Sequence, residues 1–168
     1  MTDDGWLTED QLEAWLTFQA ATTLLDAALD RQLQRDSGLP HTYYLILAML
    51  SDVPGRTLRM SDLAVMTQSS QSRLSHAVSR LESNGWVSRV PCPDDRRSTL
   101  ARLTDAGFEV LAAAAPGHVA TVRCHVFDRL SAEQVGQLRD IGAAILEGLD
   151  APAAFPGRSG QQEARLAE

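Results

Sequence analysis

The chain has 168 residues, enough for one domain with an attached oligomerisation element, and 44% of them are hydrophobic, enough to bury a core. The net charge of −7 argues against general polyanion binding, although eight arginines accompany only four acidic residues between Arg56 and Arg102. Two cysteines cannot build the disulfide framework of a secreted domain, and no run approaches the ~20 apolar residues of a membrane span, so a cytoplasmic protein is expected.

A long first helix is predicted over about residues 8–36. Thr8 and Gln11 have the spacing of a capping box, apolar residues recur at helical spacing, and Gly38 is placed to end the helix. At 1.5 Å per residue this helix would be about 40 Å long. Such a length indicates that one end packs against something outside its own domain.

The pattern that follows is that of a helix-turn-helix. A second helix is predicted over 40–51, and a short helix capped by Ser61 comes next. Ser70 is placed to cap a further helix over 71–84, which Gly85 ends. The apolar residues of that helix have i, i+3, i+4, i+7 spacing, which fixes its buried face. They are Leu74, Ala77, Val78 and Leu81.

Two short strands are predicted at 86–90 and 98–103, joined by a tip that contains Arg96 and Arg97. A helix capped by Thr104 should then run to about residue 129, with a kink at Pro116. A capping box at Ser131 begins a last helix, which ends near residue 149. Residues 151–168 are rich in Ala, Pro, Gly and Gln and are expected to be disordered.

A helix-turn-helix followed by a basic β-wing predicts that the chain binds double-stranded DNA. Arg73 is the expected base contact, because arginine pairs bidentately with guanine and the first turn of the second helix enters the major groove deepest. The other residues expected at the DNA are Gln71, Ser72 and His76 on the same exposed face, and Ser70, Ser75 and Arg80 as phosphate contacts.

Three segments resemble the MarR family of bacterial transcription regulators: RLESNGWVSR from Arg80, DRRS from Asp95 and LTDAG from Leu103. The order of elements fits over residues 8–149. The resemblance implies a mainly α fold in one domain over residues 1–150. That domain would have a winged helix-turn-helix at about 40–104 and long dimerisation helices at about 8–36 and 105–149.

The resemblance also implies how such a protein works. It would be a homodimer that binds a pseudo-palindromic operator, with two reading helices about one DNA turn, ~34 Å, apart. Asp95 would brace the wing tip, and Arg96 or Arg97 would enter the minor groove. A repressor is expected, released by a small aromatic or phenolic effector. Trp15, Phe18, His41, Tyr43 and Tyr44 are the candidate pocket residues, although aromatics at helical spacing are more often core.

Other functions remain open as alternatives. Cys92 and Cys124 would allow a thiol-responsive regulator of the same fold, and His118 and His125 raise a metal-responsive one. The two histidines lie about 10.5 Å apart along a helix, too far to share one ion unaided, so no metal or other cofactor is expected.

The sequence shows no Ser-His-Asp or Cys-His frame, phosphate-binding glycine loop or paired-carboxylate motif, so the chain is not expected to be an enzyme. A third possible function is that of a winged-helix module that binds only other proteins. A gel shift with DNA at several salt concentrations would distinguish such a module from a DNA-binding protein.

Overall fold

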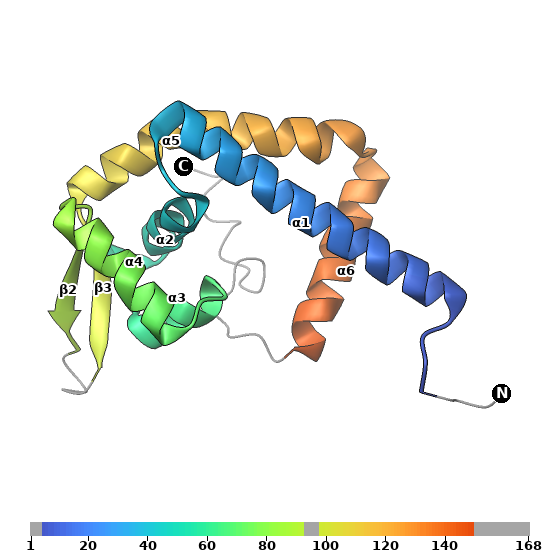
Figure 1. Ribbon diagram of the computed structural model, residues 1–168, viewed down its shortest axis with the longest axis horizontal. Coiled ribbons are helices and arrows are strands. Elements are labelled where there is room, and N and C mark those ends of the chain that lie inside the picture. The colour runs from blue at the N-terminus through green and yellow to red at the C-terminus, as the bar shows by residue number, and fades with distance from the viewer. Residues whose placement is uncertain (1–4, 93–97, 150–168) are drawn as a thin grey trace.

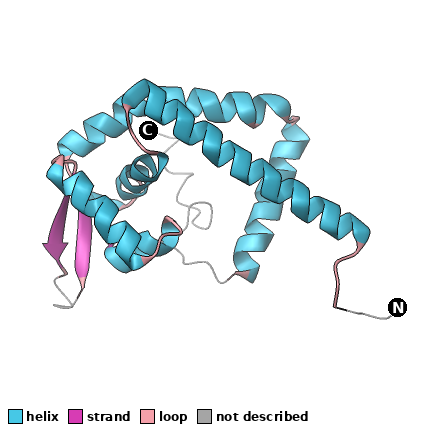
Figure 2. Ribbon diagram, in the orientation of Figure 1, coloured by secondary structure: helices cyan, strands magenta, loops and turns pink. Residues whose placement is uncertain are grey.

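The computed structural model describes residues 5–92 and 98–149. It confirms the predicted fold class: helices form most of the described chain, and a small antiparallel sheet lies at one side (Figure 2). The helices are α1 (Glu9–Ser37), α2 (His41–Ser51), α3 (Met60–Met66), α4 (Gln71–Ser83), α5 (Asp105–His125) and α6 (Ala132–Gly148). The strands are β1 (Thr57–Arg59), β2 (Val87–Pro91) and β3 (Thr99–Leu103).

The predicted caps at the ends of the long helices are confirmed. Thr8 Oγ1 accepts from the Gln11 amide at 3.3 Å, while Gln11 Oε1 accepts from the Thr8 amide at 2.9 Å. Ser131 makes the same reciprocal pair at the start of α6. Gly38 ends α1 with φ 63°, a left-handed conformation that favours glycine. These contacts are local, which is why the sequence predicts them.

Three details differ from the sequence-based expectations. Ser61 does not cap α3: because β1 holds the chain against β3 up to Arg59, the helix begins at Met60 and Ser61 lies in its first turn. The strand β1 has no counterpart among the predicted elements. Finally, α5 continues through Pro116 but ends at His125 rather than near residue 129, and a 3₁₀ turn, Phe127–Arg129, leads towards α6.

The described strands form one sheet in the order β1-β3-β2, with both pairings antiparallel. Ala101 of β3 lies between Leu58 of β1 and Arg89 of β2, and its side chain is fully buried.

Close packing explains why the LTDAG segment has a glycine at position 107. A Cβ at Gly107 would collide with the Trp86 carbonyl oxygen, so only glycine lets α5 start this close to the chain entering β2.

The core joins the second half of α1 to α2, α3, α4, the sheet and α5. Its largest fully buried side chains are Leu33, Leu39, Ile46, Leu47, Leu50, Leu63, Leu74, Leu81 and Val78. In Figure 1, α5 runs over the top of the molecule from the sheet towards α6, and the first half of α1 extends away from the sheet. No helix in the described parts of the chain is long and apolar enough to span a membrane.

The first half of α1 and the whole of α6 lie outside this core. None of the residues of α6 is buried. The large apolar side chains exposed on these two helices are Leu12, Trp15, Leu16, Phe18, Leu24, Leu138, Ile141 and Ile145. We call this set the apolar face.

Candidate nucleic-acid interface

The amphipathic pattern of α4 decides which of its side chains face solvent. Leu74, Val78 and Leu81 are at most 1% exposed and anchor the helix on the core. The opposite side is exposed and polar, and it includes every α4 residue predicted to contact DNA: Gln71, Ser72, Arg73, Ser75, His76 and Arg80. We call α4 the reading helix.

Arg73, His76 and Arg80 form one stripe along the reading helix, because they are spaced three and four residues apart. Within residues 5–92 and 98–149, none of these three side chains makes an ion pair or hydrogen bond. They are therefore available to a ligand. Ser70 caps the helix by accepting from the Arg73 amide at 3.3 Å, which leaves its hydroxyl hydrogen free to donate.

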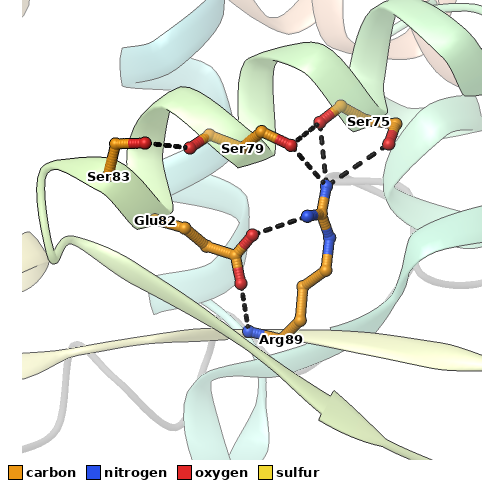
Figure 3. Close-up of polar contacts among 5 residues, drawn as sticks. All are labelled: Ser75, Ser79, Glu82, Ser83 and Arg89. Carbon is orange, nitrogen blue, oxygen red and sulfur yellow. Dashed lines mark hydrogen bonds and ion pairs between the residues drawn. The ribbon is translucent and has the colours of Figure 1, made fainter.

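Arg89 of β2 joins the wing to the reading helix (Figure 3). Its Nη1 donates to Glu82 Oε2 at 2.6 Å, and its backbone N–H donates to Glu82 Oε1 at 2.9 Å. Its Nη2 reaches the Ser75 carbonyl oxygen at 2.8 Å and the hydroxyls of Ser75 and Ser79 at 3.3 and 3.1 Å. We call this set of contacts the Arg89 clamp.

A polar groove of about 470 Å³ lies between the start of α3, the first turns of the reading helix and the wing strands. Its lining residues are Arg59, Met60, Ser61, Gln71, Ser75, Arg89, Ser98 and Thr99. Arg89 is already paired with Glu82, so the Arg59 guanidinium and several hydroxyls give the groove the chemistry of an anion site, and phosphodiester oxygens are anions of this kind.

The two arginines that flank β1 have different surroundings. Arg56 is held by Asp105 at 3.1 Å, and its guanidinium lies 4.2 Å from the centroid of the Phe108 ring, so it faces α5. Arg59 lines the polar groove, and none of the described acidic side chains pairs with it.

The sequence pattern marks Arg89 and Glu82 only as charges and gives them no role. The two residues are seven positions apart, on either side of the turn at Gly85. Glu82 lies on α4 and Arg89 on β2, so no repeat within one element relates them, and they meet because the chain turns back at Gly85 and β2 packs against α4. The wing-tip residues Asp95, Arg96 and Arg97 lie outside the described residues.

The proposed effector residues fall into two groups within one chain. Trp15 and Phe18 contact each other on the exposed part of α1, with ring centroids 6.4 Å apart. His41 and Tyr44 instead lie on α2, with ring centroids 5.8 and 4.2 Å from that of His118. The His41 backbone N–H donates to Asp30. Asp30 is 12 residues beyond Phe18, about 18 Å along α1, so the structure does not bring the two groups together in one subunit.

Tyr43 packs against the core beside the second group. A cavity of about 440 Å³ opens next to His41, between α1, α2 and the turn that precedes the reading helix. Its lining residues are Asp26, Ala27, Asp30, His41, Thr42, Leu45, Met66, Thr67 and Gln68.

Burial perturbs the ionisable groups around His118. Desolvation lowers the pKa of His41, and the nearby charges of Asp26 and Asp30 oppose that effect. Desolvation, followed by repulsion from His41, lowers the pKa of His118, whose Nδ1 is buried without a hydrogen-bond partner among the described residues. Burial raises the pKa of the Tyr44 hydroxyl.

The described cysteine and histidine side chains form neither a cysteine pair nor a cluster of metal ligands. Cys92 is buried at the end of β2, Cys124 is exposed on α5, and both are free thiols. Across residues 5–92 and 98–149, no three His, Cys, Asp or Glu side chains are grouped so that they could hold a metal ion.

A model described as the MarR family matches residues 37–98, from the end of α1 to the start of β3. Sco3205 of Streptomyces coelicolor, a MarR family transcriptional regulator solved in complex with DNA, is 53% identical, has a TM-score of 0.78, and its alignment covers 86% of this chain and 94% of that chain. AbsC of the same organism, also a MarR family transcriptional regulator, is 41% identical with a TM-score of 0.78. Its alignment covers 88% of this chain and 99% of that chain.

A curated relative, the HTH-type transcriptional regulator PecS of Dickeya dadantii, is 26% identical over 123 residues, which is 73% of this chain and 74% of its own.

Proposed function

The chain belongs to the MarR family of transcriptional regulators, and from that premise we propose that it is a homodimeric repressor that binds a pseudo-palindromic operator and leaves it when a small aromatic effector binds. The observation that carries the proposal is the stripe of Arg73, His76 and Arg80 on the reading helix, exposed and without partners among the described residues.

The chemistry of the stripe supports sequence reading. A helix that enters the major groove contacts base edges with its first turns, where Arg73 lies, and backbone phosphates further along, where Arg80 lies. The polar groove places Arg59 beside the first turn of the reading helix, where it could contact a phosphate of the DNA backbone. Sco3205, whose structure was solved with DNA, is the relative that supports this assignment.

Dimerisation is supported by the apolar face. Leu16 and Ile141 are each 57% exposed and Leu24 is 68% exposed, on sides of α1 and α6 that face away from the core of the described chain. Each such side chain contributes about 1.5–3 kcal/mol when it is fully buried, so a second copy covering these helices would be strongly stabilised. A two-fold axis would also present two reading helices to successive major grooves.

The proposed switch places the effector in the cavity beside His41. The cavity lies between α1, which would belong to the dimer body, and the turn that leads into the reading helix. A ligand held there changes DNA affinity only by as much as it prefers one arrangement of these elements over the other. Within the cavity, the His41 ring offers a stacking surface, and Asp26, Asp30 and Thr42 can accept hydrogen bonds from a phenolic hydroxyl.

The test begins with the full chain. Duplexes that bind it are selected from a random pool, and their affinity is measured across a range of salt concentrations. A recovered palindromic site that binds at least 1,000 times more tightly than random DNA, roughly the lower bound for specific regulators, supports the proposal. If the selected duplexes have no sequence in common, the proposal is contradicted. If the chain binds other proteins but no DNA, a protein-interaction module is favoured instead.

The switch is tested separately with phenolic compounds. A compound that raises the melting temperature of the free protein and also displaces the selected duplex supports an effector role. If every stabilising compound leaves the DNA equilibrium unchanged, the cavity is not a regulatory site.

A further inference from the structure

We propose that Arg89 and Glu82 are positioning residues for DNA binding: the Arg89 clamp fixes the wing at one angle to the reading helix, so that both fit one operator at the same time. This inference rests on the proposed function. It assigns to Arg89 a role that works through protein contacts rather than through contact with a phosphate.

The guanidinium of Arg89 is held by three residues of its own chain. Arg89 makes five hydrogen bonds to Glu82, Ser75 and Ser79, including one from its backbone. Its side chain and that of Glu82 are each 29% exposed, so the ion pair is partly shielded from water. The charge of Arg89 is neutralised by Glu82 and its orientation is fixed by the two serines, so it is less suited to hold a phosphate than Arg73 or Arg80, whose side chains have no partner among the described residues.

The clamp attaches along one side of the reading helix. Ser75, Ser79 and Glu82 lie at i, i+4 and i+7, which places them on that side, next to the stripe that faces solvent. Figure 3 shows the Arg89 side chain rising from β2 towards this side of the helix. The clamp thereby ties the strand that leads to the wing tip to two turns of the helix expected in the major groove.

The hydroxyl of Ser79 is oriented to receive Arg89. Ser79 Oγ donates to the Ser75 carbonyl at 2.9 Å, so the Ser79 hydroxyl hydrogen is used and its oxygen is turned to accept from Arg89. The angle between the wing and the reading helix matters because both must form hydrogen bonds to one operator at the same time. Each such hydrogen bond needs its donor and acceptor placed to within a fraction of an ångström.

The decisive variant is Glu82→Gln. Removing a negative charge beside a DNA-binding surface strengthens binding if only electrostatics counts. If the clamp positions the wing, the same change weakens operator binding about tenfold, because a charge-assisted hydrogen-bond pair is lost. Binding to random DNA should then change less than about twofold. Asp62→Asn is the matched control, since it removes an acidic charge from the same motif outside the clamp, and it should not weaken operator binding.

Arg89→Lys separates geometry from charge. A lysine keeps the positive charge but cannot bridge Glu82, Ser75 and Ser79 at once, so operator affinity should fall nearly as far as in Arg89→Ala. If Arg89 instead held a phosphate as a point charge, lysine would largely restore binding to both operator and random DNA.

Ser79→Ala covers the case in which Glu82→Gln does not fold, because it removes one acceptor of Arg89 and leaves every charge in place. Operator binding should weaken roughly two- to fivefold, and backbone amides of residues 87–91 should exchange hydrogen faster in the free protein. Unchanged or tighter operator binding by Glu82→Gln, or by Ser79→Ala if the former is unfolded, overturns the inference. A wild-type chain that binds no selected duplex contradicts the proposed function instead.

Discussion

The guanidinium of Arg56 lies 4.2 Å from the centroid of the Phe108 ring while it pairs with Asp105, so a residue next to β1 is tied to α5. Arg59, three positions later, lines the polar groove instead. From the sequence, both arginines precede the first helix of the motif and are equally candidates to contact the DNA backbone, but the structure gives them different surroundings.

These surroundings predict different consequences of mutation. Arg59→Ala should weaken DNA binding and lower the slope of log affinity against log salt by about 0.9 for each phosphate that the protein no longer neutralises. Arg56→Ala should leave that slope unchanged and cost about 0.5–1 kcal/mol of folding stability, because its guanidinium no longer covers the Phe108 ring. Salt-dependent binding isotherms and thermal melts measure both. Equal slopes for the two variants would contradict the phosphate role of Arg59.

Along the reading helix, Arg73 and Arg80 should differ in a second way. Arg73→Ala should cost about 1–3 kcal/mol on the operator and relax the base preference at one position in each half-site. Arg80→Ala should weaken operator and random DNA alike. Competition binding with operators changed one base pair at a time distinguishes the two. If Arg73→Ala lowers both affinities equally, the base-reading assignment is wrong.

The wing tip lies outside the described residues, and its prediction comes from the sequence. The double change Arg96→Ala and Arg97→Ala should weaken DNA binding and flatten the salt dependence, because fewer counterions are released. Asp95→Ala should weaken binding indirectly by loosening the tip. Unchanged affinity of the double variant in a gel shift would show that the tip does not touch DNA.

Charging the apolar face should separate the subunits. Ile141→Asp places a carboxylate among the exposed apolar residues of α6, and burying that charge costs far more than burying the isoleucine gains. Light scattering should then give the mass of one chain, against twice that mass for the wild type. Ala143→Asp, about 200° round the same helix, is the control and should leave the dimer intact. A wild-type monomer at micromolar concentration would contradict the two-fold operator as well.

Acidification should destabilise the protein through His41 and His118. Burial lowers the pKa of both imidazoles from the usual 6.5, so the unfolded chain takes up protons at a higher pH than the folded protein does. Stability is therefore complete above about pH 6.5 and is lost as the pH falls towards the lowered folded values. Melting temperatures measured from about pH 8 to about pH 5 should show this fall. His118→Phe, which cannot ionise, should reduce it, and an identical fall in that variant would contradict the assignment.

Features that depend on neighbours within about four positions could be predicted from the sequence. The hydroxyls of Thr8, Ser70 and Thr104 cap the helices that follow them, because each finds its backbone N–H within one turn. The buried and exposed sides of the reading helix follow from the 3.6-residue repeat in the same way. The residues of that helix expected to contact DNA therefore lie on its exposed side, and their contact with DNA stays a prediction.

Which charged groups meet depends on the tertiary structure. Glu82 and Arg89 are joined by the packing of β2 against α4. Arg56 and Asp105 are joined by the packing of α5 near β1, a strand that no sequence pattern indicates. A three-residue strand has almost no stability of its own and forms only because β3 offers a free edge. The partners of a long arginine side chain are likewise set by the elements that the folded core brings within its reach. No local repeat in the sequence encodes the distance between the arginine and such a partner.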